Sequence, residues 1–257
     1  MRTNHLKALL RDGQPAYGGW MSLPGIQQAR LLGRVGLDWI TVDAEHAHAD
    51  LATLAATIAA IADAGVSAPL VRLPANSVEW FKWALDAGAW GVIVPMVNSR
   101  AEAEQAVRWA KYPPEGIRSY GGAYFSLTMD ADPATYFRGA NEQILVAVQI
   151  ESAAALTDLD GIIGTDGVDV AFVGPSDLHA QLGLQPSTDG TEPAFLEALE
   201  QVKAAARRHG RALGIYCADG ATARKRVAEG FQMVNVLTDA VALRTAAARE
   251  LHTARSA

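Results

Sequence analysis

The sequence predicts an α/β protein that folds as one (β/α)8 barrel domain over residues 1–257. Short apolar runs rich in β-branched residues alternate along the whole chain with longer segments of helical periodicity, a pattern typical of a parallel sheet built from strand–helix units. The length of 257 residues also fits, since such barrels use roughly 250. Neither GxGxxG nor GxxxxGK[ST] follows a predicted strand, which argues against a nucleotide-binding open sheet.

Eight apolar runs are the candidate strands. They cover residues 16–21, 39–42, 69–73, 92–97, 144–150, 170–173, 213–216 and 233–237. The first is the weakest candidate because two glycines interrupt it. Eight units that follow one another without a linker favour a closed barrel over an open sheet.

Helical segments fill the intervals between these runs. They cover residues 26–35, 51–64, 78–87, 101–110, 153–163, 193–209, 221–229 and 240–251. A glycine just past a helix closes it in the left-handed conformation. Six glycines stand at such positions before a strand: Gly36, Gly65, Gly88, Gly167, Gly210 and Gly230.

Three segments stand outside this alternation. Residues 4–11 form a short predicted helix that would plug the floor of the barrel. Residues 112–141 form an insertion after the fourth predicted strand that is too long for an ordinary barrel loop. Residues 240–257 are alanine-rich and amphipathic, so this last segment packs either on its own barrel or on a neighbouring chain.

Composition excludes several classes of partner. A net charge of −6 argues against nucleic acid. The chain has no run of 18 apolar residues, which argues against a membrane span, and its first residues lack the pattern of a secretion signal. The single cysteine, Cys217, cannot form an internal disulfide, as is typical of a cytoplasmic protein.

Two carboxylates follow consecutive predicted strands. Glu151 follows the run 144–150, and Asp177 follows the run 170–173 beside a Gly-Pro turn. Each could merely cap the helix that comes next. However, the carboxyl ends of parallel strands meet at one face of a barrel, and carboxylate oxygens are the ligands of hard divalent cations. We therefore predict a metal site at Glu151 and Asp177.

Other strand ends supply a fixed cation and a proton carrier. His46 stands three residues after Asp43, which favours a proton-transfer role over that of an idle loop histidine. Arg72 ends a buried strand, where an unpaired guanidinium is unfavourable, so it needs either Glu45 or a ligand oxygen as its partner. Together with the two carboxylates, these side chains suit a reaction in which negative charge develops on an oxygen while a proton moves.

The distribution of lysines separates two routes to that chemistry. An aldolase that works through a Schiff base needs a lysine inside the barrel. All lysines here fall on predicted helices, and none stands at a strand end. A metal is therefore expected to stabilise any enolate. The lysines are Lys7, Lys82, Lys111, Lys203 and Lys225.

The segments DAEH, PLVRLP, VPMV, YPPEGIRS, VQIE and FVGPSDL together resemble the metal-dependent (class II) pyruvate aldolases. That family includes 4-hydroxy-2-oxoheptanedioate aldolase and 2-dehydro-3-deoxy-sugar-acid aldolases, and it is distantly related to the citrate lyase β-subunit. The resemblance covers nearly the whole chain. It implies reversible aldol cleavage of a 4-hydroxy-2-oxo acid to pyruvate, or a related 2-oxo acid, and an aldehyde through a metal-stabilised enolate. It also implies a hexamer, built as a trimer of dimers that exchange the last helix.

The resemblance assigns a role to most of the candidate residues. Oxygen ligands suit Mg²⁺, Mn²⁺ and, less selectively, Co²⁺. The Ser176 N–H would receive the substrate carboxylate, and Gly174 would let the backbone approach closely. The catalytic role of Asp86 rests on the resemblance alone, because the sequence by itself indicates only a surface residue at a helix end. The predicted metal ligands are Glu151 and Asp177, and the substrate-binding residues are Gln149, Gly174, Ser176 and Arg72. The predicted catalytic residues are Arg72, Asp86 and an acid/base dyad in which the Asp43 side chain orients His46.

The sequence leaves the type of reaction and the aldehyde pocket open. An oxaloacetate decarboxylase, or a decarboxylating enzyme related to macrophomate synthase, would use the same enolate site, and a CoA-ester lyase is a further alternative. We expect the aldehyde pocket to be drawn from the 112–141 insertion, including Arg118, Ser119 and Tyr124, with or without residues of another subunit. Arg118 would either grip a distal carboxylate of the aldehyde or pair with Glu115.

Overall fold

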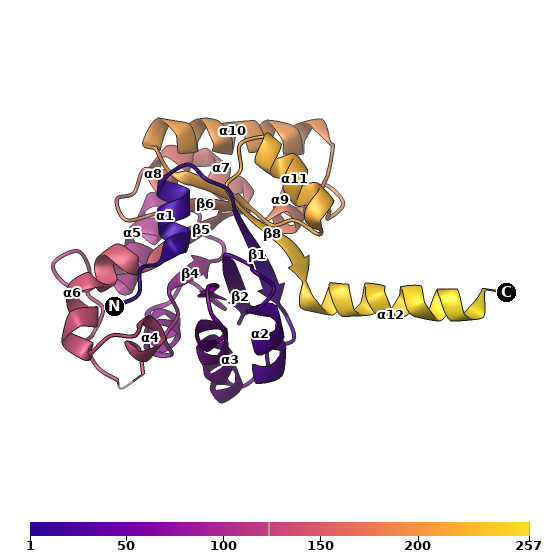
Figure 1. Cartoon of the computed structure of the whole chain (residues 1–257). Coiled ribbons are helices and arrows are strands. Elements are labelled where there is room, and N and C mark those ends of the chain that lie inside the picture. Colours follow the sequence, from indigo (N-terminus) through magenta and orange to yellow (C-terminus); the bar gives the residue numbers. More distant parts are fainter. Residues whose placement is uncertain (123, 257) are drawn as a thin grey trace.

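A computed structural model describes residues 1–122 and 124–256. Its eight strands form one closed barrel in which each strand pairs in parallel with the next, and β8 pairs with β1 (Figure 1). The predicted fold class is therefore confirmed. The strands are β1 (Ala16–Met21), β2 (Trp39–Asp43), β3 (Ala68–Arg72), β4 (Gly91–Val94), β5 (Leu145–Ile150), β6 (Val170–Val173), β7 (Ala212–Ile215) and β8 (Met233–Thr238).

All eight predicted runs correspond to strands, including the first. The two glycines of β1 have a packing reason, because a Cβ at Gly18 would lie 2.1 Å from the Trp39 ring and one at Gly19 would lie 2.9 Å from Leu37. The fourth strand is shorter than the predicted run 92–97. It ends at Val94 because Pro95 has no N–H to donate and Met96 has a φ of 52°.

Helices surround the barrel and connect its strands (Figure 1). The six predicted helix-closing glycines all have positive φ, between 60° and 146°, as expected for residues without a Cβ. Apart from the helices of the long insertion, those between consecutive strands are α2 (Ile26–Leu32), α3 (Leu51–Ala64), α4 (Val78–Asp86), α5 (Arg100–Ala110), α7 (Ala153–Thr157), α8 (Leu159–Ile163), α9 (Pro175–Gln181), α10 (Pro193–His209) and α11 (Gly220–Ala228).

The predicted helix 153–163 is in fact two short helices, α7 and α8. Asp158 separates them with φ −130° and ψ 35°, outside the helical range. Its carboxylate accepts a hydrogen bond from the Arg100 N–H at 2.8 Å. Asp158 thus joins two neighbouring loops, and this bond competes with continuation of the helix.

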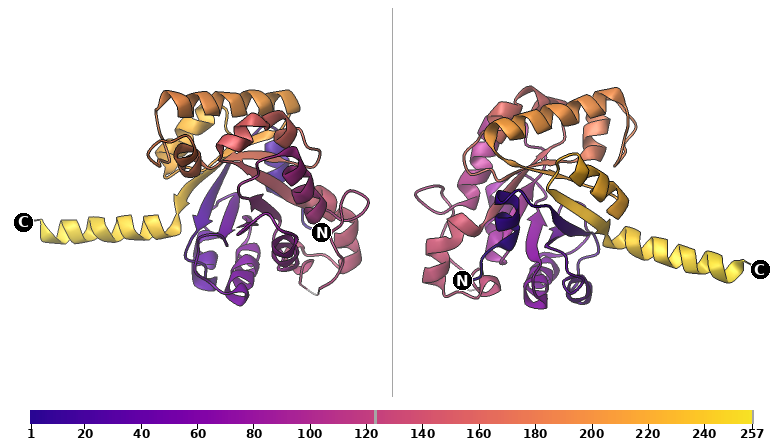
Figure 2. Two further views of the ribbon diagram at one scale, coloured as in Figure 1. Left: turned by 180° about the vertical axis from the view of Figure 1, so that it is seen from behind. Right: turned by 45° about the horizontal axis from the view of Figure 1, so that its top comes forward.

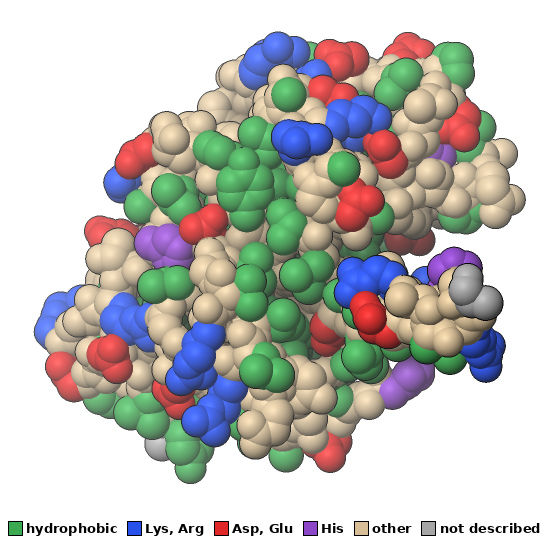
Figure 3. Space-filling model, turned by 45° about the vertical axis from the view of Figure 1, so that its right-hand side comes forward, with side chains coloured by type: hydrophobic (Ala, Val, Ile, Leu, Met, Phe, Trp, Pro, Cys, Tyr) green, Lys and Arg blue, Asp and Glu red, His purple; other side chains and the backbone are tan. Residues whose placement is uncertain are grey.

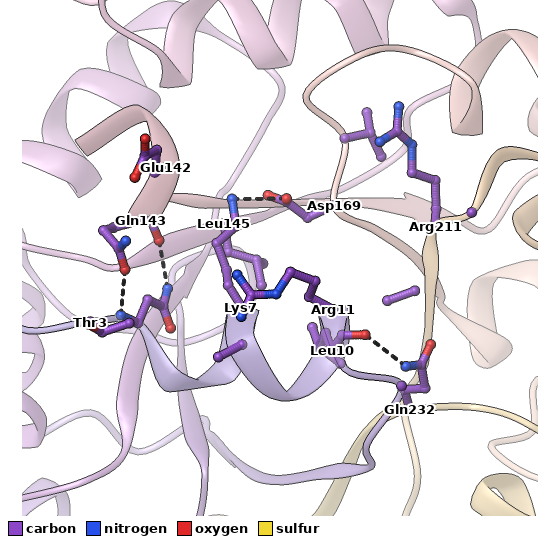
Figure 4. A pocket seen from close by; sticks show the side chains of 16 residues that line it. Thr3, Lys7, Leu10, Arg11, Glu142, Gln143, Leu145, Asp169, Arg211 and Gln232 are labelled. Atoms are coloured by element: carbon purple, nitrogen blue, oxygen red, sulfur yellow. Dashed lines mark hydrogen bonds and ion pairs between the residues drawn. The ribbon is translucent and has the colours of Figure 1, made fainter. Parts of the chain in front are cut away.

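The helix α1 (His5–Arg11) closes the floor of the barrel, as predicted. Asn4, which precedes it, donates to the main-chain oxygens of Trp90 and Gln143. Lys7 forms an ion pair of 2.9 Å with Asp169. Figure 4 shows Lys7 and Arg11 beside a cavity of about 700 Å³ at this end, which is the largest of the described cavities.

The long insertion also lies at the floor, which corrects our expectation for the aldehyde pocket. It follows α5 rather than a strand, and it contains the 3-10 helix η1 (Leu127–Met129) and α6 (Pro133–Gln143). Thr128 donates to the Gly88 carbonyl just before β4. Figure 2 shows this segment beside the N-terminus, at the end of the barrel away from the last helix. Within one chain, the insertion is therefore too far from the carboxyl ends of the strands to line a pocket there.

The last helix, α12 (Asp239–Arg255), leaves the barrel after β8 and has no buried residue. Its exposed side chains include Val241, Leu243 and Leu251. It stands clear of the body of the protein in all views of the whole chain (Figures 1, 2 and 3). Of the two alternatives for this segment, packing on its own barrel is wrong, and packing on a neighbouring chain stays a prediction. In the part of the chain that the structure describes, no helix is both long enough and apolar enough to cross a membrane.

Candidate active site

A cavity of about 420 Å³ opens at the carboxyl ends of the strands. Every predicted site residue except Asp86 lines it, although these residues come from four different strands and the loops that follow them. The lining residues are Trp20, Ser22, Asp43, His46, Arg72, Gln149, Glu151, Phe172, Gly174, Pro175, Ser176, Asp177, Thr188, Tyr216 and Thr238.

Arg72 is held at the mouth of the barrel by two carboxylates. Its Nε donates to Asp43 Oδ1 at 3.0 Å and its Nη2 to Asp43 Oδ2 at 2.5 Å. Its Nη1 lies 3.1 Å from Glu45 Oε2, so the predicted Glu45 partner is confirmed. The Arg72 side chain is 12% exposed, and its guanidinium lies 5.0 Å from the centre of the Trp20 ring. The group is therefore a cation with a fixed orientation.

Asp43 accepts hydrogen bonds from every side. Besides the two from Arg72, it accepts from Trp20 Nε1 at 3.2 Å and from the main-chain N–H groups of Glu45 and His46. Burial alone would raise the pKa of Asp43, but the hydrogen bonds and the charge of Arg72 hold that pKa below its usual range. Asp43 is thus an ionised anchor for Arg72 and for the loop that carries His46.

His46 lies on the rim of the cavity, and its side chain is 64% exposed. Within the described residues, Asp43 reaches His46 through the main-chain N–H rather than the ring. The carboxylate nearest to the ring is Glu45, whose Oε2 lies 3.9 Å from Nε2. The expected side-chain pairing of His46 with Asp43 is therefore not formed, because Arg72 and Trp20 already use the Asp43 oxygens.

Glu151 and Asp177 meet at the same cavity. Glu151 follows β5 and is 2% exposed, whereas Asp177 stands in the first turn of α9. Burial, together with the charges of Asp177 and Glu45, raises the pKa of Glu151 to about 7, although the Met96 N–H opposes this rise. Carboxylates crowded in this way repel one another, and a cation between them would relieve the repulsion.

The groups around Glu151 fit a divalent cation. A Cβ at Gly174 would lie 2.0 Å from Glu151 Oε2, so a larger residue at this position would displace the carboxylate. Gln149 Nε2 donates to the same oxygen at 2.6 Å, while Gln149 Oε1 is buried with no partner among the described residues. No three His, Cys, Asp or Glu side chains in the described ranges converge on one point. Two carboxylates would therefore share the cation with water or substrate oxygens.

Asp86 and Arg118 lie away from this cavity, at the floor. Asp86 ends α4, and its Oδ1 accepts from Arg118 Nη2 at 3.2 Å. Arg118 is 3% exposed and also donates to the Tyr136 hydroxyl. The alternative pairing of Arg118 with Glu115 is thus replaced by one with Asp86, and Arg118 does not line the cavity of its own chain.

The opposite wall of the cavity carries residues that our sequence analysis did not identify. The Tyr216 hydroxyl and Thr238 Oγ1 lie 2.7 Å apart, and the Tyr216 ring packs edge-on against Trp20 at 5.5 Å. Ser22 and Thr188 also line this side. Tyr216 and Thr238 stand at the ends of β7 and β8, so the strand-end rule applied to Glu151 would have found them too.

Comparison with known proteins places the chain in a family. Residues 18–246 match the HpcH/HpaI aldolase/citrate lyase family. A hydroxypyruvate/pyruvate aldolase of Rhizorhabdus wittichii is 36% identical over 248 residues, 96% of this chain and 97% of that protein. A 5-keto-4-deoxy-D-glucarate aldolase of Shigella dysenteriae is 37% identical over 243 residues, 95% of this chain and 93% of that protein.

A solved structure agrees with these matches. The structure of an HpcH/HpaI aldolase/citrate lyase family protein from Burkholderia cenocepacia superposes with a TM-score of 0.90 at 38% identity, over 99% of this chain and all of that one. The resemblance inferred from the motifs is confirmed. The chain belongs to the HpcH/HpaI aldolase/citrate lyase family and is an enzyme of its aldolase class.

Proposed function

We propose that this enzyme cleaves 4-hydroxy-2-oxo acids to pyruvate, or a related 2-oxo acid such as hydroxypyruvate, and an aldehyde, and that it catalyses the reverse condensation. The observation that carries the proposal is the position of Arg72. It is fixed by Asp43 and Glu45 and lines the same cavity as the carboxylates Glu151 and Asp177. An arginine so oriented stabilises an oxygen on which negative charge develops.

Glu151 and Asp177 would hold a divalent cation, either Mg²⁺ or Mn²⁺ or, less selectively, Co²⁺. When bound, such a cation acts as a Lewis acid toward the oxygens of a 2-oxo acid. On the protein side, Gln149 Oε1 is a buried acceptor that has no hydrogen-bond partner among the described residues. The Ser176 N–H, in the first turn of α9, would bind the substrate carboxylate where Gly174 leaves room.

The remaining residues of the cavity would orient the substrate and transfer the proton. Arg72 would donate its hydrogen bonds to the enolate oxygen of pyruvate. His46 would remove the 4-hydroxyl proton in cleavage and return it in condensation. The hydroxyl pair of Tyr216 and Thr238 would face the aldehyde, and such a wall suits an aldehyde that carries hydroxyl groups.

The decisive experiment needs no knowledge of the aldehyde. Solvent-deuterium exchange at the pyruvate methyl group is followed by NMR with and without EDTA, and then with added Mg²⁺ or Mn²⁺. Exchange that EDTA abolishes and the metal restores is the expected result. Exchange that survives EDTA would overturn the metal assignment. Turnover of oxaloacetate far above that of every hydroxy-oxo acid tested would point to the decarboxylase alternative instead.

We also propose that the protein forms a homo-oligomer, as a hexamer in which α12 packs on a neighbouring chain. The support is that this helix buries no side chain on its own barrel. In such an assembly Asp86 would approach the active site of a neighbour. Light scattering after size-exclusion chromatography should show a mass that falls when residues 243–257 are deleted, and an unchanged mass would exclude the role of α12. A cytoplasmic location is part of the same proposal, and the buried free thiol of Cys217 supports it.

A further inference from the structure

Met96 adopts a backbone conformation that residues other than glycine rarely adopt. Its φ of 52° places it in the left-handed region, and within the described residues only Asp130 among non-glycine residues shares this property. Met96 lies two residues after the end of β4, beside the active site, whereas Asp130 lies in the floor insertion. Such conformations persist where the surroundings hold them, and they cluster at functional sites.

Two hydrogen bonds hold the Met96 residue at both ends. Its N–H donates to Glu151 Oε1 at 2.8 Å. Its carbonyl accepts from Asn98 Nδ2, also at 2.8 Å. The left-handed turn is what allows the N–H to point back toward the cavity while the carbonyl faces the next loop. Met96 contributes main-chain atoms here, since its side chain is 41% exposed.

Asn98 connects this turn to the residue after Glu151. Its Oδ1 accepts a short hydrogen bond from the Ser152 hydroxyl, and its N–H donates to Glu102 Oε2 at 2.6 Å. A closed ring results, from the Glu151 carboxylate through Met96 and Asn98 to Ser152 and back along the chain. The other oxygen of Glu151 is held by Gln149. The carboxylate is therefore oriented in advance on both of its oxygens.

We propose that Asn98 is a positioning residue for the metal carboxylate Glu151 and acts through the left-handed peptide at Met96. The proposal rests on the function proposed above, because it takes Glu151 to be a metal ligand. The positioning role of Asn98 can be distinguished from a structural role, because the helix that follows does not depend on the Asn98 side chain. Helix α5 has its own N-cap, Ser99, which accepts from the Glu102 N–H, so starting this helix does not require the Asn98 side chain.

The test is the affinity of the metal-free enzyme for Mn²⁺, measured without substrate from the electron paramagnetic resonance signal of the free ion. Asn98→Ala should weaken binding by about tenfold, at the lower end of what removal of a ligand's supporting partner does. The double variant Asn98→Ala, Met96→Gly should regain most of the affinity, because glycine adopts positive φ without strain. Met96→Val should weaken binding like Asn98→Ala, since a β-branched residue resists this conformation.

A matched control exists at the other end of the barrel. Asn141 bridges a loop in the same manner, accepting from the Tyr112 N–H and donating to the Tyr112 carbonyl. Asn141→Ala should lower the melting temperature without changing the affinity for Mn²⁺. Should Asn98→Ala fail to fold, Met96→Val carries the test.

The outcomes separate the proposal from the proposed function. Glu151→Gln should abolish tight binding of Mn²⁺. Wild-type enzyme that does not bind Mn²⁺, or a Glu151→Gln variant that binds it normally, would overturn both the metal site and the role of Asn98. Loss of binding in Glu151→Gln with unchanged binding in Asn98→Ala would overturn the positioning role alone. A loss in Asn98→Ala that Met96→Gly does not restore would overturn the route through the Met96 peptide.

Discussion

Asp43 and Arg72 are register partners on the neighbouring strands β2 and β3, and each is the last residue of its strand. Their side chains form a two-point ion pair directly at the mouth of the barrel. The pairing of the strands therefore sets the position of the guanidinium. Because Asp43 also accepts from the Glu45 N–H in the loop after β2, one carboxylate fixes both the cation and the start of the segment with His46.

Replacing Asp43 by Asn should slow deuterium exchange at the pyruvate methyl group by roughly 10- to 100-fold. The reason is the loss of charge-assisted hydrogen bonds worth about 1.5–3 kcal/mol, where each 1.36 kcal/mol corresponds to a factor of ten. Glu45 still neutralises Arg72, so the protein should fold. The control is Asp160→Asn, which removes an exposed partner of Arg208 and should leave exchange unchanged. Normal exchange in Asp43→Asn would show that orientation of Arg72 does not limit the reaction.

Replacing Gly174 by Ala should abolish Mn²⁺ binding while the barrel stays folded. The added methyl group would lie 2.0 Å from Glu151 Oε2 and 3.1 Å from Gln149 Nε2, so the carboxylate must move. Titration calorimetry with Mn²⁺ measures the effect. Gly220→Ala is the matched control, because a Cβ there meets no atom within 4 Å. A Gly174→Ala variant with wild-type affinity would mean that Glu151 moves without consequence.

Replacing His46 by Gln should lower the rate of aldol cleavage by about 10²- to 10⁴-fold, the range for loss of a general acid or base. The melting temperature should stay constant, since the His46 side chain is 64% exposed. His48→Gln, two residues further along the same exposed loop, supplies the control and should be fully active. Equal losses in the two variants would indicate a disturbed loop rather than a lost proton carrier.

Replacing Lys111 by Gln should change the pH dependence of stability. Burial and the nearby Lys7 lower the pKa of Lys111 to about 8, and its Nζ donates to two main-chain carbonyls. The unfolded chain, in which the pKa is near 10.5, binds the proton more tightly. Stability of the wild type relative to Lys111→Gln should therefore rise between pH 8 and 10.5, by an amount on the order of 3 kcal/mol.

Urea unfolding at a series of pH values measures this difference. Gln keeps a donor for the carbonyls but does not titrate, so the comparison isolates the proton. Lys82→Gln, at an exposed position on α4, should show no such trend. A flat difference for Lys111→Gln would mean that the buried amine does not lose its proton in this range.

The sequence allowed the barrel and most of its mouth to be predicted, because both follow from local patterns. A buried strand that stops at a polar residue marks the catalytic face, and Glu151 and Asp177 were found in this way. The six helix-closing glycines could be predicted as well, since the end of a helix restricts the backbone conformation locally. These features depend on a few neighbouring residues and on the parallel topology.

Features that depend on partners far apart in the chain were beyond the sequence. His46 follows Asp43 closely, yet the carboxylate binds Arg72 and Trp20, 29 and 23 residues away. Similarly, the sequence predicts that the 112–141 insertion contributes to a substrate pocket. Its position after α5 rather than after a strand places it at the floor. The turn at Met96 is not predictable from the sequence, because a methionine side chain does not favour positive φ.

The isolation of α12 has a consequence for dilute solutions. Seventeen residues of helix without a buried side chain are only marginally stable in water, so this segment should be helical while a second surface covers Val241 and Leu243. Its helix content should then follow mass action. Progressive dilution should reduce the far-ultraviolet circular dichroism that α12 contributes before the barrel itself unfolds. The helix content of α12 would then depend on the concentration of the protein.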